Sequence, residues 1–110
     1  NMTVSELIEK TGYDPLLLSD GDREITGGYA GDLLSWVMGR ASSDNAWITI
    51  MSNANVIAVA TLTDVSAVIL AEGVAPDDEI ISLAMEKSVN LITTSLPSYE
   101  CAVAISGKLK

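Results

Sequence analysis

The sequence Asp22-Arg23-Glu24-Ile25-Thr26-Gly27-Gly28-Tyr29 combines the most demanding backbone choices in this chain. Two opposite charges open it, a short extended run follows, and two adjacent glycines come shortly before Asp32. Glycine adopts positive φ and allows close backbone approach, which a Cβ atom would forbid. We therefore expect Asp22 and Arg23 to pair, Gly27 and Gly28 to form a turn, and Asp32 to cap the helix that follows.

The residues before this stretch predict one helix and two short strands. Thr3-Val4-Ser5-Glu6 has the spacing of a capping box, in which the Thr3 and Glu6 side chains satisfy backbone N–H groups at a helix start. Gly12 is expected to end that helix. Leu16 to Leu18 is then a short strand, and Arg23 to Thr26 is the returning strand.

After Asp32 the chain alternates between helical and strand patterns. We expect helices at 32–38, 53–61, 78–88 and 98–106, and strands at 47–51, 67–70 and 90–94. Val56 to Val59 has strand propensity. We nevertheless expect a helix there, because two parallel strands need a crossover connection between them. Nearly unbroken apolar strands separated by helices are typical of parallel sheets. We therefore predict an α/β fold with three layers and a mostly parallel central sheet.

Composition restricts the partners. The chain has 110 residues, so we expect a single domain spanning 2–110, with Asn1 added ahead of Met2 during cloning. A net charge of −9 opposes binding to nucleic acid or an anionic membrane. The apolar runs are too short for a membrane span. The chain has no His and one Cys, Cys101, so we expect no metal, no cofactor and a reducing, cytoplasmic location.

The stretch from Asp22 to Gly28 resembles the signature of the DRTGG domain. Three flanking blocks also resemble that family, namely Asp32-Leu33-Leu34-Ser35, Trp47-Ile48-Thr49-Ile50 and Asn55 to Ala60. The resemblance runs from Thr3 to about Ile105. It implies a fold similar to the N-terminal domain of HPr kinase/phosphorylase and, more distantly, to the N-terminal domains of bacterial cell-wall ligases. In larger proteins the domain accompanies CBS-domain pyrophosphatases and phosphate acetyltransferases, where it looks regulatory or assembly-forming.

The sequence gives no support for catalysis. A kinase phosphate-binding loop needs GxxxxGK[ST], but here Ala102 stands at the first Gly position and Leu109 follows Gly107-Lys108. Cys101 lies on an expected helix among small apolar residues, which favours a core position over a nucleophile. We therefore expect that the chain is not an enzyme.

One candidate ligand site is the Thr26-Gly27-Gly28 turn, whose backbone N–H groups could hold an anion. The alternative is structural: the glycines let two backbones pass closely while Asp22 and Arg23 pair to fix the turn. If Asp32 caps the helix, its carboxylate satisfies the same donors and repels a second anion. We favour the structural interpretation.

A second candidate is the crevice at the carboxyl ends of the parallel strands, where ligands of open α/β sheets bind. The polar or small residues expected there are Ser52, Asn53, Asn55, Glu72, Gly73, Thr94 and Ser95. The commoner explanation for such residues is that they cap helices and form turns.

Two functions therefore stay open. The first is a non-catalytic regulatory or scaffolding domain that self-associates as a homodimer, with a protein partner in its pathway. The alternative is a sensor that binds a nucleotide or phosphometabolite at the strand ends or at the Gly27-Gly28 turn. Trp36 and Trp47 are expected to be packing anchors, and an exposed one would mark an interface.

Overall fold

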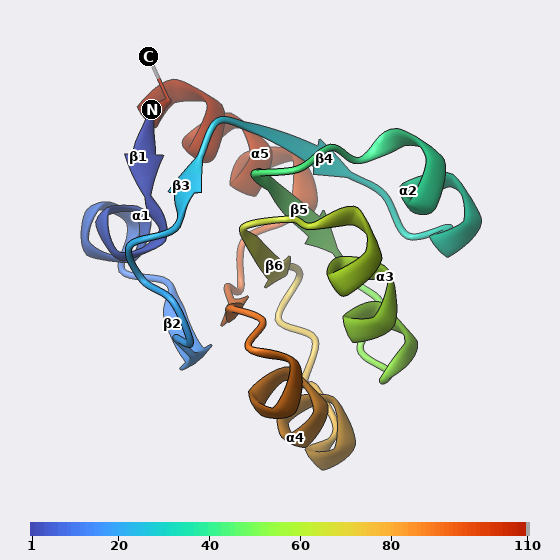
Figure 1. Ribbon diagram of the computed structural model, residues 1–110. Helices are drawn as coiled ribbons and strands as arrows, with labels where there is room; N and C mark the ends of the chain where they lie inside the picture. The colour runs from blue at the N-terminus through green and yellow to red at the C-terminus, as the bar shows by residue number, and fades with distance from the viewer. Residues whose placement is uncertain (110) are drawn as a thin grey trace.

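The computed structural model describes residues 1–109 and has the expected α/β architecture (Figure 1). Its elements in order are β1 (Met2–Thr3), α1 (Val4–Thr11), β2 (Asp14–Leu17), β3 (Glu24–Ile25), β4 (Gly27–Ala30), α2 (Leu34–Arg40), β5 (Asn45–Thr49), α3 (Asn55–Thr63), β6 (Ala67–Leu70), α4 (Asp78–Lys87), β7 (Leu91–Thr93) and α5 (Ser98–Lys108). The central sheet has the order β2-β7-β6-β5-β4, and only β2 runs antiparallel to its neighbour. The prediction of a mostly parallel sheet between helical layers is confirmed.

The central strands are buried on both faces, as parallel strands under two helical layers must be. Along β6, Ala67 and Ile69 pack in the core beside α1 and α5, whereas Val68 and Leu70 pack in the core beside α2, α3 and α4. Figure 1 shows α5, in red, on the opposite side of the sheet from α2, α3 and α4. Successive side chains of a strand point to opposite faces, so four apolar residues in a row serve both layers.

The local signals around α1 are confirmed. Thr3 Oγ1 accepts a hydrogen bond from the Glu6 N–H at 3.1 Å, and Glu6 Oε1 accepts one from the Thr3 N–H at 2.9 Å, which completes the capping box. These two bonds hold the pKa of the Glu6 carboxyl below its usual value. Gly12 ends the helix with φ of 73°. The helices expected at 53–61, 78–88 and 98–106 also form, with ends that differ by at most a turn.

The prediction for the Gly27-Gly28 turn is wrong. Gly27 to Ala30 form β4, the edge strand that pairs in parallel with β5, and neither glycine has positive φ. A Cβ atom on Gly28 would lie 3.3 Å from the Ala46 carbonyl oxygen, so close approach, not turn geometry, is what this glycine permits. Pairing with the buried strand β5 outweighs the low strand propensity of glycine.

Two further predictions near this stretch are wrong, namely the returning strand and the Asp32 cap. The expected returning strand is reduced to β3, which pairs with β1 in a separate two-stranded sheet and not with β2. The helix after Asp32 begins at Leu34 and continues through Gly39 to Arg40, and its cap residue is Leu33. Asp32 instead accepts hydrogen bonds at the end of β5, from Thr49 Oγ1 and the Ile50 N–H, both at 2.8 Å.

The two tryptophans differ. Trp47 is fully buried and donates its indole N–H to the Gly31 carbonyl at 2.9 Å, so it is the packing anchor that the sequence predicts. Trp36 is 52% exposed, and the Arg40 guanidinium lies 3.7 Å from its ring centroid. Within residues 1–109, none of the helices is long and apolar enough to span a membrane.

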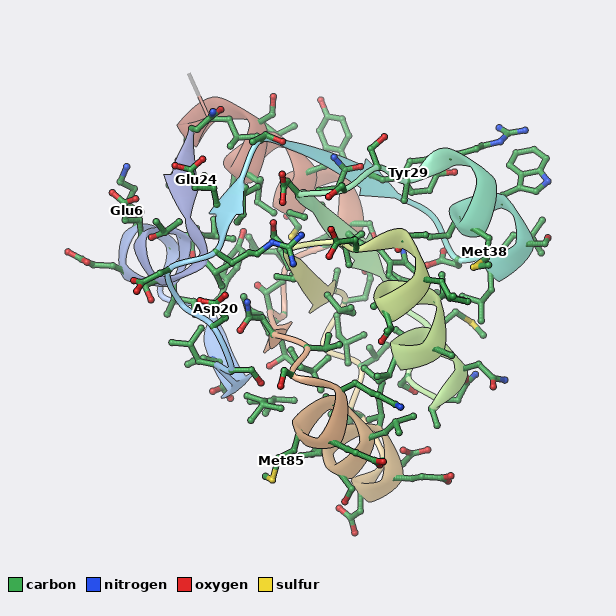
Figure 2. All side chains as sticks on the ribbon, viewed as in Figure 1. Glu6, Asp20, Glu24, Tyr29, Met38 and Met85 are labelled. Carbon is green, nitrogen blue, oxygen red and sulfur yellow. The ribbon has the colours of Figure 1, made fainter. Side chains whose placement is uncertain are left out.

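A buried amide joins the amino-terminal half to the sheet. Asn90 donates to the carbonyl oxygens of Asp20 and Ser66 at 2.8 and 2.9 Å, and it accepts from the Asp20 N–H at 2.9 Å. Figure 2 shows Asp20 on the loop that follows β2. The Asn90 side chain therefore holds this loop against the starts of β6 and β7.

We predict that Asn90→Ala lowers the free energy of unfolding by about 3 kcal/mol, because the three hydrogen bonds from the buried amide to backbone groups of Asp20 and Ser66 are lost. Urea denaturation followed by circular dichroism measures the change. Asn53→Ala is the control: Asn53 only accepts from the nearby Asn55 N–H, and its replacement should cost under about 1 kcal/mol. Equal losses in the two variants would contradict this role of Asn90.

Candidate functional site

The expected Asp22–Arg23 pair does not form. Arg23 instead reaches Asp44 and Asp64, with Nη2 at 2.9 Å from the Asp44 carboxylate and 3.1 Å from the Asp64 carboxylate. It also donates to the Asp64 carbonyl at 2.6 Å. Both aspartates have positive φ, at 67° and 59°. Asp22 uses its N–H to donate to the Asp20 carboxylate at 3.2 Å. Arg23 thus fixes two left-handed loop positions at the amino-terminal edge of the sheet.

The remaining residues of the glycine stretch do not form an anion site. The Thr26 N–H donates to the Asp44 carbonyl at 3.0 Å, and Gly27 and Gly28 belong to the strand ladder with β5. A helix start with unpaired N–H groups is what the anion hypothesis requires, and β4 leads instead into a loop ahead of Leu34. Gly27 and Gly28 line a largely apolar groove between β4 and α5.

The residues expected in the strand-end crevice do not all lie together. Gly73, Thr94 and Ser95 line one open hollow of about 490 Å³, which we call the strand-end pocket; its walls are Thr11, Gly12, Tyr13, Asp14, Gly73, Val74, Thr93, Thr94, Ser95 and Leu96. Ser52, Asn53 and Asn55 lie after β5 and do not line it. The structure therefore brings together three of the seven expected residues.

Several polar groups at this edge have structural partners. The Glu72 carboxylate accepts from the Ser98 N–H at 2.8 Å, at the first turn of α5. Thr94 Oγ1 accepts from the Leu96 N–H at 3.2 Å. Asn53 Oδ1 accepts from the Asn55 N–H at 2.9 Å, a short turn ahead of α3. Glu72 and Gly73 both have positive φ, at 64° and 70°, so the chain turns sharply after β6.

The contribution of α1 and β2 to this pocket was not predicted from the sequence. Thr11, Gly12, Tyr13 and Asp14 come from the corner between these two elements, about 60 residues before Gly73 in the chain. β2 takes its place beside β7 with Asp14 opposite Thr93, and this antiparallel register sets the corner against the strand ends. No local pattern predicts such a pairing, although Gly12 was recognisable as a helix end.

The lone thiol and the phenol beside it are buried. Cys101 is buried in α5, and burial raises the pKa of its thiol away from the thiolate form. Burial also raises the pKa of the Tyr13 phenol beside it. Among the described residues the Tyr13 hydroxyl is the one buried side-chain nitrogen or oxygen atom without a hydrogen-bond partner. No group of His, Cys, Asp and Glu side chains within residues 1–109 is arranged to hold a metal ion.

Comparison with known protein families finds the DRTGG domain. The family model of the DRTGG domain matches residues 33–107, which is more than half of the chain. This chain belongs to the DRTGG domain family. The resemblance inferred from the sequence is confirmed, although the matched range starts after Gly28. The assignment of the family signature to the stretch from Asp22 to Gly28 therefore stays a prediction.

A solved structure with this fold comes from Clostridium perfringens. It contains the CBS and DRTGG domains of the regulatory region of a pyrophosphatase, complexed with the activator diadenosine tetraphosphate. The TM-score is 0.74 at 18% sequence identity, and the similarity covers 94% of the present chain and 46% of the Clostridium chain. The likeness concerns the fold. A search of curated proteins found no match.

We predict that Arg23→Met lowers the free energy of unfolding by about 1–2 kcal/mol, because two loop positions lose their charge-assisted hydrogen bonds. Arg40→Met is the matched control, since Arg40 stacks on the exposed Trp36 ring, and its loss should cost under about 1 kcal/mol. Chemical denaturation of both variants measures the difference. An Arg23→Met variant as stable as the parent protein would show that the aspartates hold these loops without it.

Proposed function

We propose that this DRTGG domain is a non-catalytic regulatory or scaffolding module that self-associates as a homodimer. The observation that carries the proposal is a pair of adjoining hollows at α5 and β4, whose lining residues are all uncharged. We call the surface that they form the α5–β4 face, and it consists of Gly27, Gly28, Tyr29, Ala30, Ala46, Ile48, Tyr99, Ala102, Val103, Ile105, Ser106, Gly107 and Leu109.

Two adjoining hollows shape this face. One, of about 390 Å³, lies between β4 and α5, and the other, of about 440 Å³, lies on the outer side of α5. Both are lined by Ala102 and Ser106, so they are continuous. Tyr99 is 79% exposed and Val103 is 53% exposed beside them. Large apolar and aromatic side chains around a region without charge are typical of the centre of a protein interface.

The two edges of the central sheet differ in a way that supports the same proposal. β2 carries Asp14 and Pro15 and has an irregular register against β7, all of which hinder pairing with another strand. β4 has the sequence Gly-Gly-Tyr-Ala, without charge, proline or register shift. Figure 2 shows Tyr29 on this strand. An edge without such protection is suited to contact with a second chain.

The non-catalytic part of the proposal is supported by the state of the lone thiol and by the family. Cys101 is buried and its thiol pKa is raised, which leaves it poorly nucleophilic at neutral pH. The solved Clostridium relative places a DRTGG domain within a regulatory region of a larger enzyme.

We predict that Val103→Glu converts a dimer at tens of micromolar into a monomer, because a carboxylate would be desolvated at the centre of the α5–β4 face. Leu62→Glu is the control: Leu62 is 71% exposed on α3, away from this face, and its replacement should leave the dimer intact. Sedimentation velocity distinguishes the species, and thermal melting checks that both variants fold. A parent protein that is monomeric at these concentrations would overturn the proposal.

A second candidate function is binding of a nucleotide or phosphometabolite. The strand-end pocket favours it, because about 490 Å³ lies within the usual range for small-ligand sites and the location is typical for this sheet type. The Clostridium relative was solved with diadenosine tetraphosphate. The Gly27-Gly28 alternative is disfavoured, because that groove is apolar and has no helix start.

For this second function we expect an adenine compound at a hundred times its dissociation constant to raise the free energy of unfolding by about 2.7 kcal/mol. Thermal shift measurements with adenosine, AMP and diadenosine tetraphosphate over a range up to the millimolar test it. A melting temperature unchanged by all three would exclude adenine compounds as ligands of this chain.

A further inference from the structure

We propose that the strand-end pocket binds an uncharged, hydroxyl-bearing ligand such as a nucleoside, and that phosphate groups stay outside it. This inference rests on the second function above and specifies the part of a nucleotide that the pocket accepts. It follows from the electrostatics of the walls together with their hydrogen-bonding groups.

The walls offer hydroxyl groups between apolar surfaces. Thr93, Thr94 and Ser95 carry hydroxyls at the pocket, and Val74 and Leu96 provide apolar contact. The Thr11 hydroxyl is already used, because it donates to the Leu7 carbonyl at 2.7 Å and accepts from the Tyr13 N–H at 3.2 Å. The Thr94 hydroxyl accepts from the Leu96 N–H and keeps its own proton for donation. Ser95 is exposed and, among the described residues, its hydroxyl has no hydrogen bond. A neutral molecule with hydroxyl or amino groups can bind such walls.

The charges around the pocket oppose an anion. None of the lining residues, all of which the structure describes, is Lys or Arg, and Asp14 contributes a carboxylate. The carboxyl-terminal end of α1 borders the pocket at Thr11 and Gly12, and this is the negative end of a helix dipole. A phosphate placed here would meet two sources of negative potential, and Lys10, the cation in the last turn of α1, does not line the pocket.

The positive end of α5, which follows the pocket, is already used. α5 begins at Ser98, shortly after the lining residues Ser95 and Leu96, and its first turn could attract a phosphate. However, the Glu72 carboxylate accepts from the Ser98 N–H at 2.8 Å. An anionic side chain therefore occupies the position that a phosphate would need. The groups that remain in the pocket are suited to a neutral ligand.

The test compares adenosine with AMP, which differ by one phosphate group. Heteronuclear NMR titration of the full chain measures both affinities and maps the affected amides. The titration is run in about 0.15 M salt, where the Debye length is about 8 Å. We expect adenosine to bind at least about fivefold more tightly than AMP, with shifts at Gly12, Gly73 and Ser95. AMP binding as tight as adenosine or tighter would overturn the inference while leaving the second function intact.

Variants make the assignment specific. Ser95→Leu fills the pocket and should weaken adenosine binding about tenfold, whereas Ser82→Leu, on the exposed surface of α4, should not change it. Asp14→Asn removes the wall carboxylate and should raise AMP affinity about fivefold relative to adenosine. If neither compound binds at millimolar concentration, both the inference and the second function fail. Unchanged affinity in Ser95→Leu would overturn the location.

Discussion

The requirement to bury both faces of the parallel strands determines the rest of this structure. β5, β6 and β7 carry apolar residues at consecutive positions, and each of these must be covered from one side or the other. α2, α3 and α4 cover one face, and α1 and α5 cover the opposite face (Figure 1). The side chains that stay outside these two cores are then the ones available for recognition. One such side chain is that of Met85, which is exposed on the outer surface of α4 (Figure 2).

α5 takes part in both of the proposed functions. Its first turn is held by Glu72 beside the strand-end pocket, and its buried side contributes Cys101 and Ile105 to the core. Its outer side continues into the groove above Gly27 and Gly28. Because these glycines carry no side chains, β4 leaves that groove open next to the helix. The part of the α5–β4 face that lies between β4 and α5 therefore depends on the glycines in the edge strand.

The elements with strong local signals were predictable from the sequence. The capping box at Thr3, the apolar strand β6 and the helices after it follow from patterns within a few residues. The stretch around Gly27 and Gly28 was misread because glycine permits both a turn and a strand, and the partner that decides between them is β5, about 18 residues later. Arg23 and Asp32 were misread for the same reason, since their partners lie 17 to 41 residues away.

The candidate site shows the same division. Gly73, Thr94 and Ser95 were predictable because they follow parallel strands, where ligands of such sheets bind. Asp14 and Thr11 were not, because only the antiparallel addition of β2 beside β7 brings the corner after α1 to the pocket. The charge of the pocket depends on this corner. Its preference for a neutral ligand could therefore be inferred only from the structure.

The measurement that tests the central claim most directly is amide hydrogen exchange of the parent protein at 1 and 100 micromolar. If the chain self-associates through the α5–β4 face, the amides of β4 and α5 exchange more slowly at the higher protein concentration. The amides of β2 and α4 then show no change. Exchange that is independent of concentration, or protection that appears at β2 or α4 instead, would contradict the account.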